Sequence, residues 1–365
     1  MVDRVAAEIE RLGSISFDRY MELALYADPG GFFATGRGAG RQGRDFLTSP
    51  ETGPVFGAMV SRVIDREWRA LGEPDPFVVV EAGAGNGRLA REVLRATPAC
   101  RPALLYVLVE RSAALRAEQR DLLEIEPPGE AHPGRAGPIV TSLETLPAIG
   151  VGGVLIANEL LDNLPFALAE WDGARWHEVR VGAGRSPVLA PIAPGDEPSL
   201  APFGRPAAGA RVPMPRALDA WFRGAGTAID RGRLVLIDYC VDAAQLIERG
   251  ERWLRTYRDH ERGHDPFAAA PGECDITGDV VLQHVERAAR AAGFGATTVT
   301  PQAEWLRALG IDDHVVEGDR IWNERAVLGD LAALEARSRR TQAAALTDPD
   351  GLGGFTVLEL PRTRA

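Results

Sequence analysis

The feature that most constrains the fold is a strand, a glycine-rich turn and a helix in direct succession. Residues 77–80 form a short apolar run rich in valine, which is typical of a parallel strand buried on both faces. Gly83, Gly85 and Gly87 follow at alternate positions, and residues 88–95 then return to a helical apolar spacing. Glycine permits a sharp backbone turn and the close approach of a ligand to main-chain atoms. The succession predicts the opening βα unit of a nucleotide-binding α/β fold.

The spacing of the glycines indicates which ligand the turn binds. A dinucleotide-binding turn reads G-x-G-x-x-G, whereas here the third glycine comes one residue earlier and Glu81 stands two residues before the first. This E-x-G-x-G-x-G form resembles motif I of the class I S-adenosylmethionine (SAM) methyltransferases. SAM has a cationic sulfonium and no pyrophosphate, so an acid beside the turn suits it. A nicotinamide cofactor and a turn without any ligand are the alternatives.

A second acid stands where the ribose of such a ligand would need it. Residues 104–109 form another strand run that ends in Glu110, 23 residues after Gly87. Glu110 is predicted to hold the ribose hydroxyls, and the adenine is placed beside Ser142 and Leu143, after a third short strand. The simpler reading of Glu110 is an acid at a helix start. The full set of predicted cofactor-binding residues is Glu81, Gly83, Ala84, Gly85, Gly87, Glu110, Arg111, Ser142, Leu143 and Asn158.

Composition excludes several classes of protein. All 41 basic residues are arginines, which rules out a Schiff-base lysine and the lysine of a P-loop. The net charge of −11 argues against nucleic-acid binding and favours a cationic partner. No apolar run approaches the roughly 18 residues that predict a membrane span. The three cysteines are scattered and lack zinc spacing, so no metal site is predicted. Together with an N-terminus unlike a signal or transit peptide, they predict a cytoplasmic location.

The order of the predicted elements gives a domain plan. Residues 1–75 are expected to form a helical cover, and residues 76–365 a Rossmann-like SAM-binding domain with a seven-stranded, mostly parallel α/β sheet. An insertion after the fourth strand spans 166–230, within which the Pro- and Gly-rich residues 182–215 are expected to be irregular. Residues 249–277 are expected to form a polar loop. A homodimer is an open possibility.

Several separated segments together resemble one family, the MidA family of SAM-dependent methyltransferases. They appear in family order and cover nearly the whole chain. Two departures stand out, since Cys240 occupies a position where the family usually has glycine and residues 182–215 are unusually irregular. The matching segments are residues 45–51, 81–87, 157–165, 237–239, 271–277 and 302–311.

The resemblance implies methylation of an arginine in a partner protein, as in the family's mitochondrial member. The acids at predicted strand ends support this implication, because a guanidinium has five donors that suit paired carboxylates. Glu159 and Asp162, with Asn158, are predicted to orient the acceptor and take its proton. For Glu159 and Asp162, the alternative is two acids in the first turn of a helix capped by Asn158. The predicted substrate-binding residues are Asp45, Ser49, Pro50, Glu51, Asp238, His264 and Asp275.

Two rival functions remain open at this stage. One is a small-molecule O- or N-methyltransferase, in which Glu159, Asp162 and Asn163 would mimic a divalent-metal site. The other is an assembly factor that binds SAM without turnover and uses the N-terminal cover and the insertion as partner surfaces.

Overall fold

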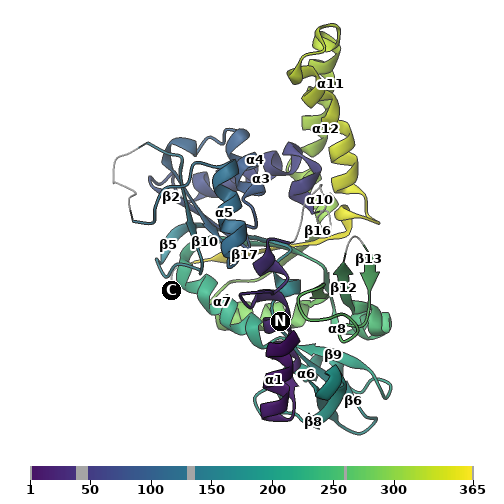
Figure 1. Ribbon diagram of the computed structural model, residues 1–365. Coiled ribbons are helices and arrows are strands. Elements are labelled where there is room, and N and C mark those ends of the chain that lie inside the picture. Colours follow the sequence, from purple (N-terminus) through teal and green to yellow (C-terminus); the bar gives the residue numbers. More distant parts are fainter. Residues whose placement is uncertain (1, 38–47, 130–135, 259–260, 364–365) are drawn as a thin grey trace.

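The computed structural model describes residues 2–37, 48–129, 136–258 and 261–363. Within these ranges, seven strands form a central mixed sheet (Figure 1). Five neighbouring strands are parallel, and β17 is antiparallel to both of its neighbours. The α/β architecture expected from the sequence is confirmed. In spatial order the strands are β16 (Thr298–Pro301), β17 (Thr356–Arg362), β10 (Ile229–Asp238), β5 (Val151–Asn158), β2 (Phe77–Ala82), β3 (Leu104–Val109) and β4 (Ile139–Leu143).

The central strands are buried on both faces because their side chains alternate between two apolar cores. Phe77 and Val79 of β2 belong to one core, and Val78 and Val80 to the other. The first core is closed by α3 (Pro54–Ala70), α4 (Arg88–Arg95) and α10 (Gln302–Ala308), and the second by α7 (Arg216–Ala228) and α9 (Leu282–Ala291). Part of the expected N-terminal cover thus differs from the prediction: α3 packs on the central sheet itself, because its apolar stripe faces that core.

A second sheet lies between β5 and β10 in the sequence. Residues 182–215, expected to be irregular, contain two of its strands and a short helix, α6 (Glu197–Leu200). Prolines stand at both ends of the edge strand β8, where no ladder hydrogen bond is lost. The N-terminal segment adds a strand of its own to this sheet. Its strands are β1 (Ile15–Ser16), β7 (Trp176–Val181), β6 (Ala167–Trp171) and β9 (Arg211–Met214), with β8 (Pro187–Pro191) paired to β7.

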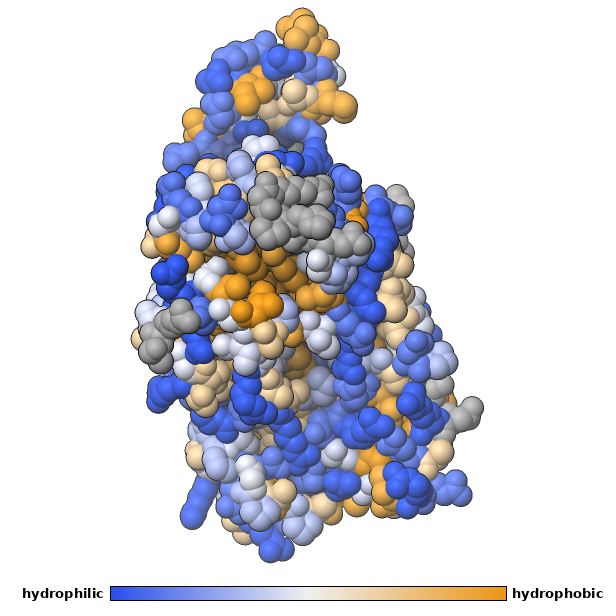
Figure 2. Space-filling view, turned by 90° about the vertical axis from the view of Figure 1, so that its left-hand side faces the viewer, coloured by the Kyte–Doolittle hydropathy of each residue, from blue (hydrophilic) through white to orange (hydrophobic). Residues whose placement is uncertain are grey.

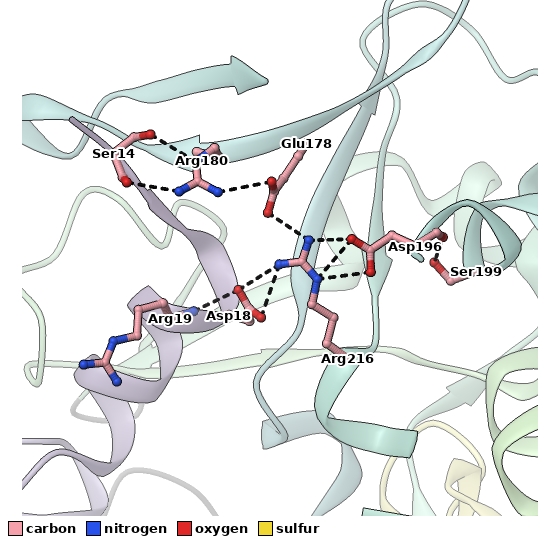
Figure 3. A network of polar contacts seen from close by, with 8 residues as sticks. All are labelled: Ser14, Asp18, Arg19, Glu178, Arg180, Asp196, Ser199 and Arg216. Atoms are coloured by element: carbon pink, nitrogen blue, oxygen red, sulfur yellow. Dashed lines mark hydrogen bonds and ion pairs between the residues drawn. The ribbon is translucent and has the colours of Figure 1, made fainter. Parts of the chain in front are cut away.

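A network of charges fastens the N-terminal segment to the second sheet (Figure 3). Arg216, at the start of α7, forms ion pairs with Asp196 at 2.6 Å, Glu178 at 3.1 Å and Asp18 at 3.3 Å. These three acids come from three different parts of the chain, so one guanidinium joins them to α7. The N-terminal elements are α1 (Val2–Leu12), α2 (Phe17–Met21), the π-helix η1 (Glu22–Tyr26) and the 3-10 helix η2 (Phe33–Thr35).

The described residues within 249–277 include three strands where a polar loop was expected. Thr256 and Tyr257 favour extended structure, and they pair with strands on both sides. The elements of this part of the chain are β11 (Cys240–Val241), α8 (Ala243–Arg249), η8 (Gly250–Trp253), β12 (Leu254–Arg258), β13 (Glu261–Gly263), β14 (Asp275–Gly278) and β15 (Val280–Val281).

A helical hairpin made of α11 (Ile311–Arg325) and α12 (Leu331–Thr347) projects from the body of the molecule (Figure 1). Its tip, η9 (Ala326–Leu328) and the start of α12, is apolar and open to solvent, with Val327 99% and Leu331 79% exposed (Figure 2). None of the helices in the described ranges is long and apolar enough to span a membrane. The other end of α12 returns to the body beside η3 (Ser49–Thr52).

Candidate active site

The glycine turn lies at the carboxyl end of β2. Gly83 and Ala84 donate their backbone N–H groups to the carbonyl of Val109, at 2.9 and 3.1 Å. A Cβ on Gly83 would lie 2.9 Å from Leu160, whereas no described atom lies within 4 Å of a Cβ on Gly85. Gly85 has a φ of 52°, so the turn needs glycine for its backbone and leaves open space above it.

A cavity of about 490 Å³ occupies that space. Its wall is made by the glycine turn, by residues at the ends of β3, β4 and β5, and by residues of η3, the N-terminal segment and α7. Both carboxylates and apolar side chains line it, which suits a ligand with both an apolar and a cationic part. Among the lining residues are Tyr26, Phe33, Pro50, Glu51, Glu81, Gly83, Ala84, Gly85, Arg88, Glu110, Arg111, Leu146, Asn158, Glu159 and Trp221.

Two buried glutamates flank the turn. Glu81 accepts a hydrogen bond from the Tyr106 hydroxyl at 2.7 Å, and burial raises its pKa to about 8. Glu110 accepts from the N–H of Gly85 at 2.9 Å and from that of Ser112 at 2.7 Å. Burial also raises the pKa of Glu110, while these backbone donors act in the opposite direction. The turn is therefore framed by carboxyl groups whose charge costs free energy until a cation arrives.

Glu159 follows β5 in a backbone conformation unusual for a residue with a side chain. Its φ is 52°, and its N–H donates to the carbonyl of Ile237 at 2.8 Å. Its Oε1 accepts from Asn158 Nδ2 at 3.0 Å, and burial, reinforced by Asp162, raises its pKa to about 8. Left-handed backbone at a non-glycine residue costs on the order of 1–3 kcal/mol and concentrates at functional sites. The turn aims this carboxyl group into the cavity.

Asn158 offers an acceptor that the protein leaves unused. Its Oδ1 is buried on the cavity wall and has no hydrogen-bond partner among the residues the structure describes. An unpaired buried acceptor costs about 1–3 kcal/mol. A ligand with an N–H or O–H donor would satisfy it.

The 3-10 helix η3 forms another part of the cavity wall. Pro50 and Glu51 line it, and Glu51 lies 3.5 Å from Arg88 of α4. Ser49 is buried behind them and donates its backbone N–H to Glu159 at 3.4 Å. Asp45, also predicted to bind substrate, lies outside the described residues.

Three predicted acids support the site from behind instead of lining it. Asp238 accepts from the N–H groups of Leu161 and Tyr239, both at 2.8 Å. Asp162 pairs with the hydroxyl of Thr277, and Asp275 accepts from Asn163 at 2.8 Å. These contacts orient the turn after β5. His264 is exposed after β13, away from the cavity wall. Asp162, Asp238, Asp275 and His264 therefore do not face the cavity.

The wall expected beside Ser142 and Leu143 is formed by the residues that follow them. The Ser142 hydroxyl donates to Gln119 at 2.6 Å, and the Leu143 carbonyl accepts from the N–H of Glu110. Both groups therefore bond to other parts of the protein. Gly87 also faces the protein, since a Cβ there would lie 3.0 Å from Leu123. The cavity wall at this edge is made by Glu144, Thr145 and Leu146.

Arg111 lies on the cavity wall and ties the N-terminal segment to it. The guanidinium donates to both oxygens of Glu22, and its Cζ lies 4.6 Å from the centre of the Tyr26 ring. Tyr26 and Phe33, whose rings stack at 5.5 Å, therefore close one side of the cavity. Sequence reasoning missed both, and it also missed Trp221, because each belongs to an ordinary amphipathic segment that only the tertiary fold brings here.

Across the described part of the chain, no group of three or more histidine, cysteine, aspartate or glutamate side chains is arranged to hold a metal ion. The fold and the site are those of an α/β methyltransferase: a mixed sheet of seven strands, a glycine turn after one strand and a carboxylate after the next. Residues 59–300 match the model of a family of S-adenosyl-L-methionine-dependent methyltransferases. This match covers more than half of the chain, so the chain belongs to that family, and the resemblance noted in the sequence is confirmed.

Relatives in several animals agree with this assignment. The chain is 28% identical to the mitochondrial protein arginine methyltransferase NDUFAF7 homolog of Drosophila melanogaster, over 80% of this chain and 70% of the relative. It is 27% identical to NDUFAF7 of Rattus norvegicus, over 86% of this chain and 74% of that protein. Both relatives are mitochondrial proteins. This contradicts the cytoplasmic location that the cysteines and the N-terminus predicted.

A solved structure from Burkholderia thailandensis is similar over the full chain. It has a TM-score of 0.82 and 29% identity, covers 100% of this chain and 92% of its own, and was determined bound to S-adenosyl-homocysteine. SAM is therefore the cofactor of this protein, as the glycine turn predicted. The residues present fit it, because the carboxylates at the turn suit a sulfonium and the space above Gly85 is open.

Proposed function

We propose that this protein transfers a methyl group from SAM to an arginine guanidinium of a partner protein. The observation that carries the proposal is the pair formed by Asn158 and Glu159. The unpaired Oδ1 of Asn158 and the carboxyl group of Glu159 face the same cavity, which the glycine turn also lines. The names of the animal relatives, which are protein arginine methyltransferases, support the same acceptor.

Each group would have a distinct task. A guanidinium has five donors and no acceptor, so it would donate to the Asn158 Oδ1 and to the Glu159 carboxylate together. Bound SAM supplies the methyl group. The guanidinium nitrogen that attacks the methyl group must lose a proton, and a carboxyl with a pKa of about 8 is better suited to take it than an ordinary glutamate. Much of the acceleration would come from orientation and from carboxylates that offset two neighbouring cations.

We further propose that the expected N-terminal cover and the insertion at 166–230 serve the acceptor. Tyr26 and Phe33 come from the first, and Trp221 from the second, and all three line the cavity. Since the cofactor turn belongs to the central sheet, these apolar residues would form the passage for the stem of an arginine side chain.

The test compares cells that lack the gene and carry either the wild-type protein or Glu159→Gln. We expect methylarginine on a small set of proteins with the wild type and its loss with Glu159→Gln, measured by quantitative mass spectrometry. Both proteins should bind S-adenosylhomocysteine alike, and exposed Glu248→Gln should behave as wild type. Methylation of a small molecule alone would overturn the arginine acceptor, and wild-type binding without any methyl transfer would favour an assembly factor.

A further inference from the structure

Gln302 is fully buried at the start of α10, and both its amide group and its backbone N–H form hydrogen bonds. Its Oε1 accepts from the Ser49 hydroxyl at 3.2 Å and its Nε2 donates to the Leu346 carbonyl at 3.3 Å. Its backbone N–H donates to the Phe355 carbonyl at 2.7 Å. Its side chain is 0% exposed. The amide therefore joins η3, beside the active site, to α12 of the projecting hairpin.

Ser49 in turn reaches the active site through its backbone. Its N–H donates to Glu159 Oε1, and its carbonyl accepts from the Thr52 hydroxyl at 2.8 Å. Its own hydroxyl is bound by Gln302, so the position of Ser49 depends on that amide. A contact of 3.4 Å to a carboxylate weakens steeply if the donor moves further away.

A second glutamine fixes the far end of the same loop. Gln342 of α12 accepts from the N–H of Val55 at 3.2 Å, and a Cβ on Gly53 would lie only 2.4 Å from it. The loop is therefore held at both ends by side chains that contact or belong to α12.

We propose that Gln302 is a positioning residue for the methyl-transfer reaction: it holds Ser49 so that the Ser49 N–H orients the carboxylate of Glu159, and it couples that carboxylate to α12. This inference rests on the role proposed for Glu159. It goes beyond that role because it assigns a task to a residue on a different element, 143 positions further along the chain.

The rival explanation is that Gln302 only packs α10 against the body. If the amide is purely structural, removing it changes the unfolding temperature and leaves the pKa of Glu159 unchanged. If it positions Ser49, removing it raises that pKa, because the charged form of the carboxyl group loses a hydrogen bond. The other titratable or charged groups that act on Glu159 or share its cavity must be the same in all the proteins compared. They are Asp162, Asp238, Tyr239, Tyr26, Glu51, Glu81, Glu110, Glu144, Arg88 and Arg111.

The experiment uses no acceptor, so the identity of the acceptor cannot affect it. SAM and S-adenosylhomocysteine are titrated by calorimetry into the purified protein from pH 6 to 9.5. Only SAM carries the sulfonium charge, so the ratio of the two dissociation constants reports the charge of the cavity. For the wild type, we expect preference for SAM to rise with pH as the cavity carboxyls ionise.

Gln302→Met keeps the shape of the side chain and removes its hydrogen bonds. We expect the midpoint of the pH profile to move upward by about half a unit or more. Ser49→Ala should give a similar shift, and the double variant no more than either alone, because both changes break the same link. In a Glu159→Gln background, Gln302→Met should leave the profile unchanged.

Gln283→Met is the control, since Gln283 of α9 also accepts a hydrogen bond, from the backbone N–H of Ala243 at 3.1 Å, away from the cavity. Its profile should coincide with that of the wild type. An unshifted midpoint in folded Gln302→Met, or an equal shift in Gln283→Met, would overturn the proposal. If Gln302→Met does not fold, Ser49→Ala decides the question, because it leaves the bond between Gln302 and Leu346 in place.

Discussion

The hydroxyl of Tyr106 lies 2.7 Å from Oε2 of Glu81, and both side chains are buried behind the glycine turn. They stand on the neighbouring parallel strands β3 and β2, so the register of the sheet sets this contact. The bond fixes a cofactor-site carboxyl group from within the sheet. It also stabilises the charged form of Glu81, since the hydroxyl donates to it.

Tyr106→Phe should therefore weaken both folding and cofactor binding. We expect the free energy of unfolding to fall by about 1–3 kcal/mol, because a buried carboxyl loses its donor. The affinity for SAM should fall by up to about tenfold, measured by calorimetry. Tyr20→Phe is the control, since Tyr20 is buried and donates to Pro266 at 3.0 Å. It should lower stability alone, and equal loss of binding in both variants would contradict the role of the Tyr106 contact.

Stability should decrease as pH rises from about 4.5 to about 8. Glu81 and Glu159 each have a pKa of about 8 in the folded protein, against an ordinary value of 4.5. Between these values the folded protein retains protons that the unfolded chain has released, so raising the pH favours unfolding. Each group contributes a slope of up to about 1.4 kcal/mol per pH unit.

Urea unfolding at pH 5 to 8.5 measures this slope. Glu81→Gln should flatten it, because an amide does not titrate, whereas Glu248→Gln on an exposed helix face should leave it as in the wild type. A slope that is the same in Glu81→Gln and the wild type would show that Glu81 does not retain its proton on folding.

The central fold and the cofactor turn could be predicted from the sequence because both depend on local patterns of residues. We could recognise the valine-rich run, the three glycines and the acid after the next strand without knowing the tertiary structure. The direction in which side chains point at strand ends could not be recognised in this way. Asp162 and Asp238 were expected to face the ligand, and they bind Thr277 and backbone N–H groups behind it.

The second sheet and the aromatic residues that line the cavity could not be predicted from local pattern for a different reason. Tyr26 reaches the cavity because its segment is fastened there by the pairing of β1 with β7 and by the contact between Glu22 and Arg111. Trp221 comes from a helix far along the chain. Contacts of that sequence separation depend on packing, which no short window of residues encodes.

Gly85→Val should abolish cofactor binding while leaving a folded protein. The branched side chain would project into the open space above the turn, where the cofactor must approach main-chain atoms. Gly184→Val is a matched control: Gly184 has a φ of 63°, and no described atom lies within 4 Å of a Cβ placed there. Both variants carry similar backbone strain, so calorimetry with S-adenosylhomocysteine should separate them. Retained binding in Gly85→Val would contradict the assignment of the turn.

Arg216→Met should loosen the N-terminal segment from the second sheet. The guanidinium pairs with Asp18, Glu178 and Asp196, and its removal leaves three carboxylates close together with no shared cation (Figure 3). We expect the free energy of unfolding to fall by about 1–3 kcal/mol. This is less than for a fully buried network, because the ion pairs are partly exposed. Hydrogen exchange should rise in α2 and β7 before it rises in the central sheet.

Arg320→Met, which breaks exposed pairs with Glu317 and Glu324 on α11, should have little effect on stability or on exchange in these elements. If both variants behave alike, or if exchange in α2 stays as in the wild type, the ion-pair network does not hold the segment in place and apolar packing does.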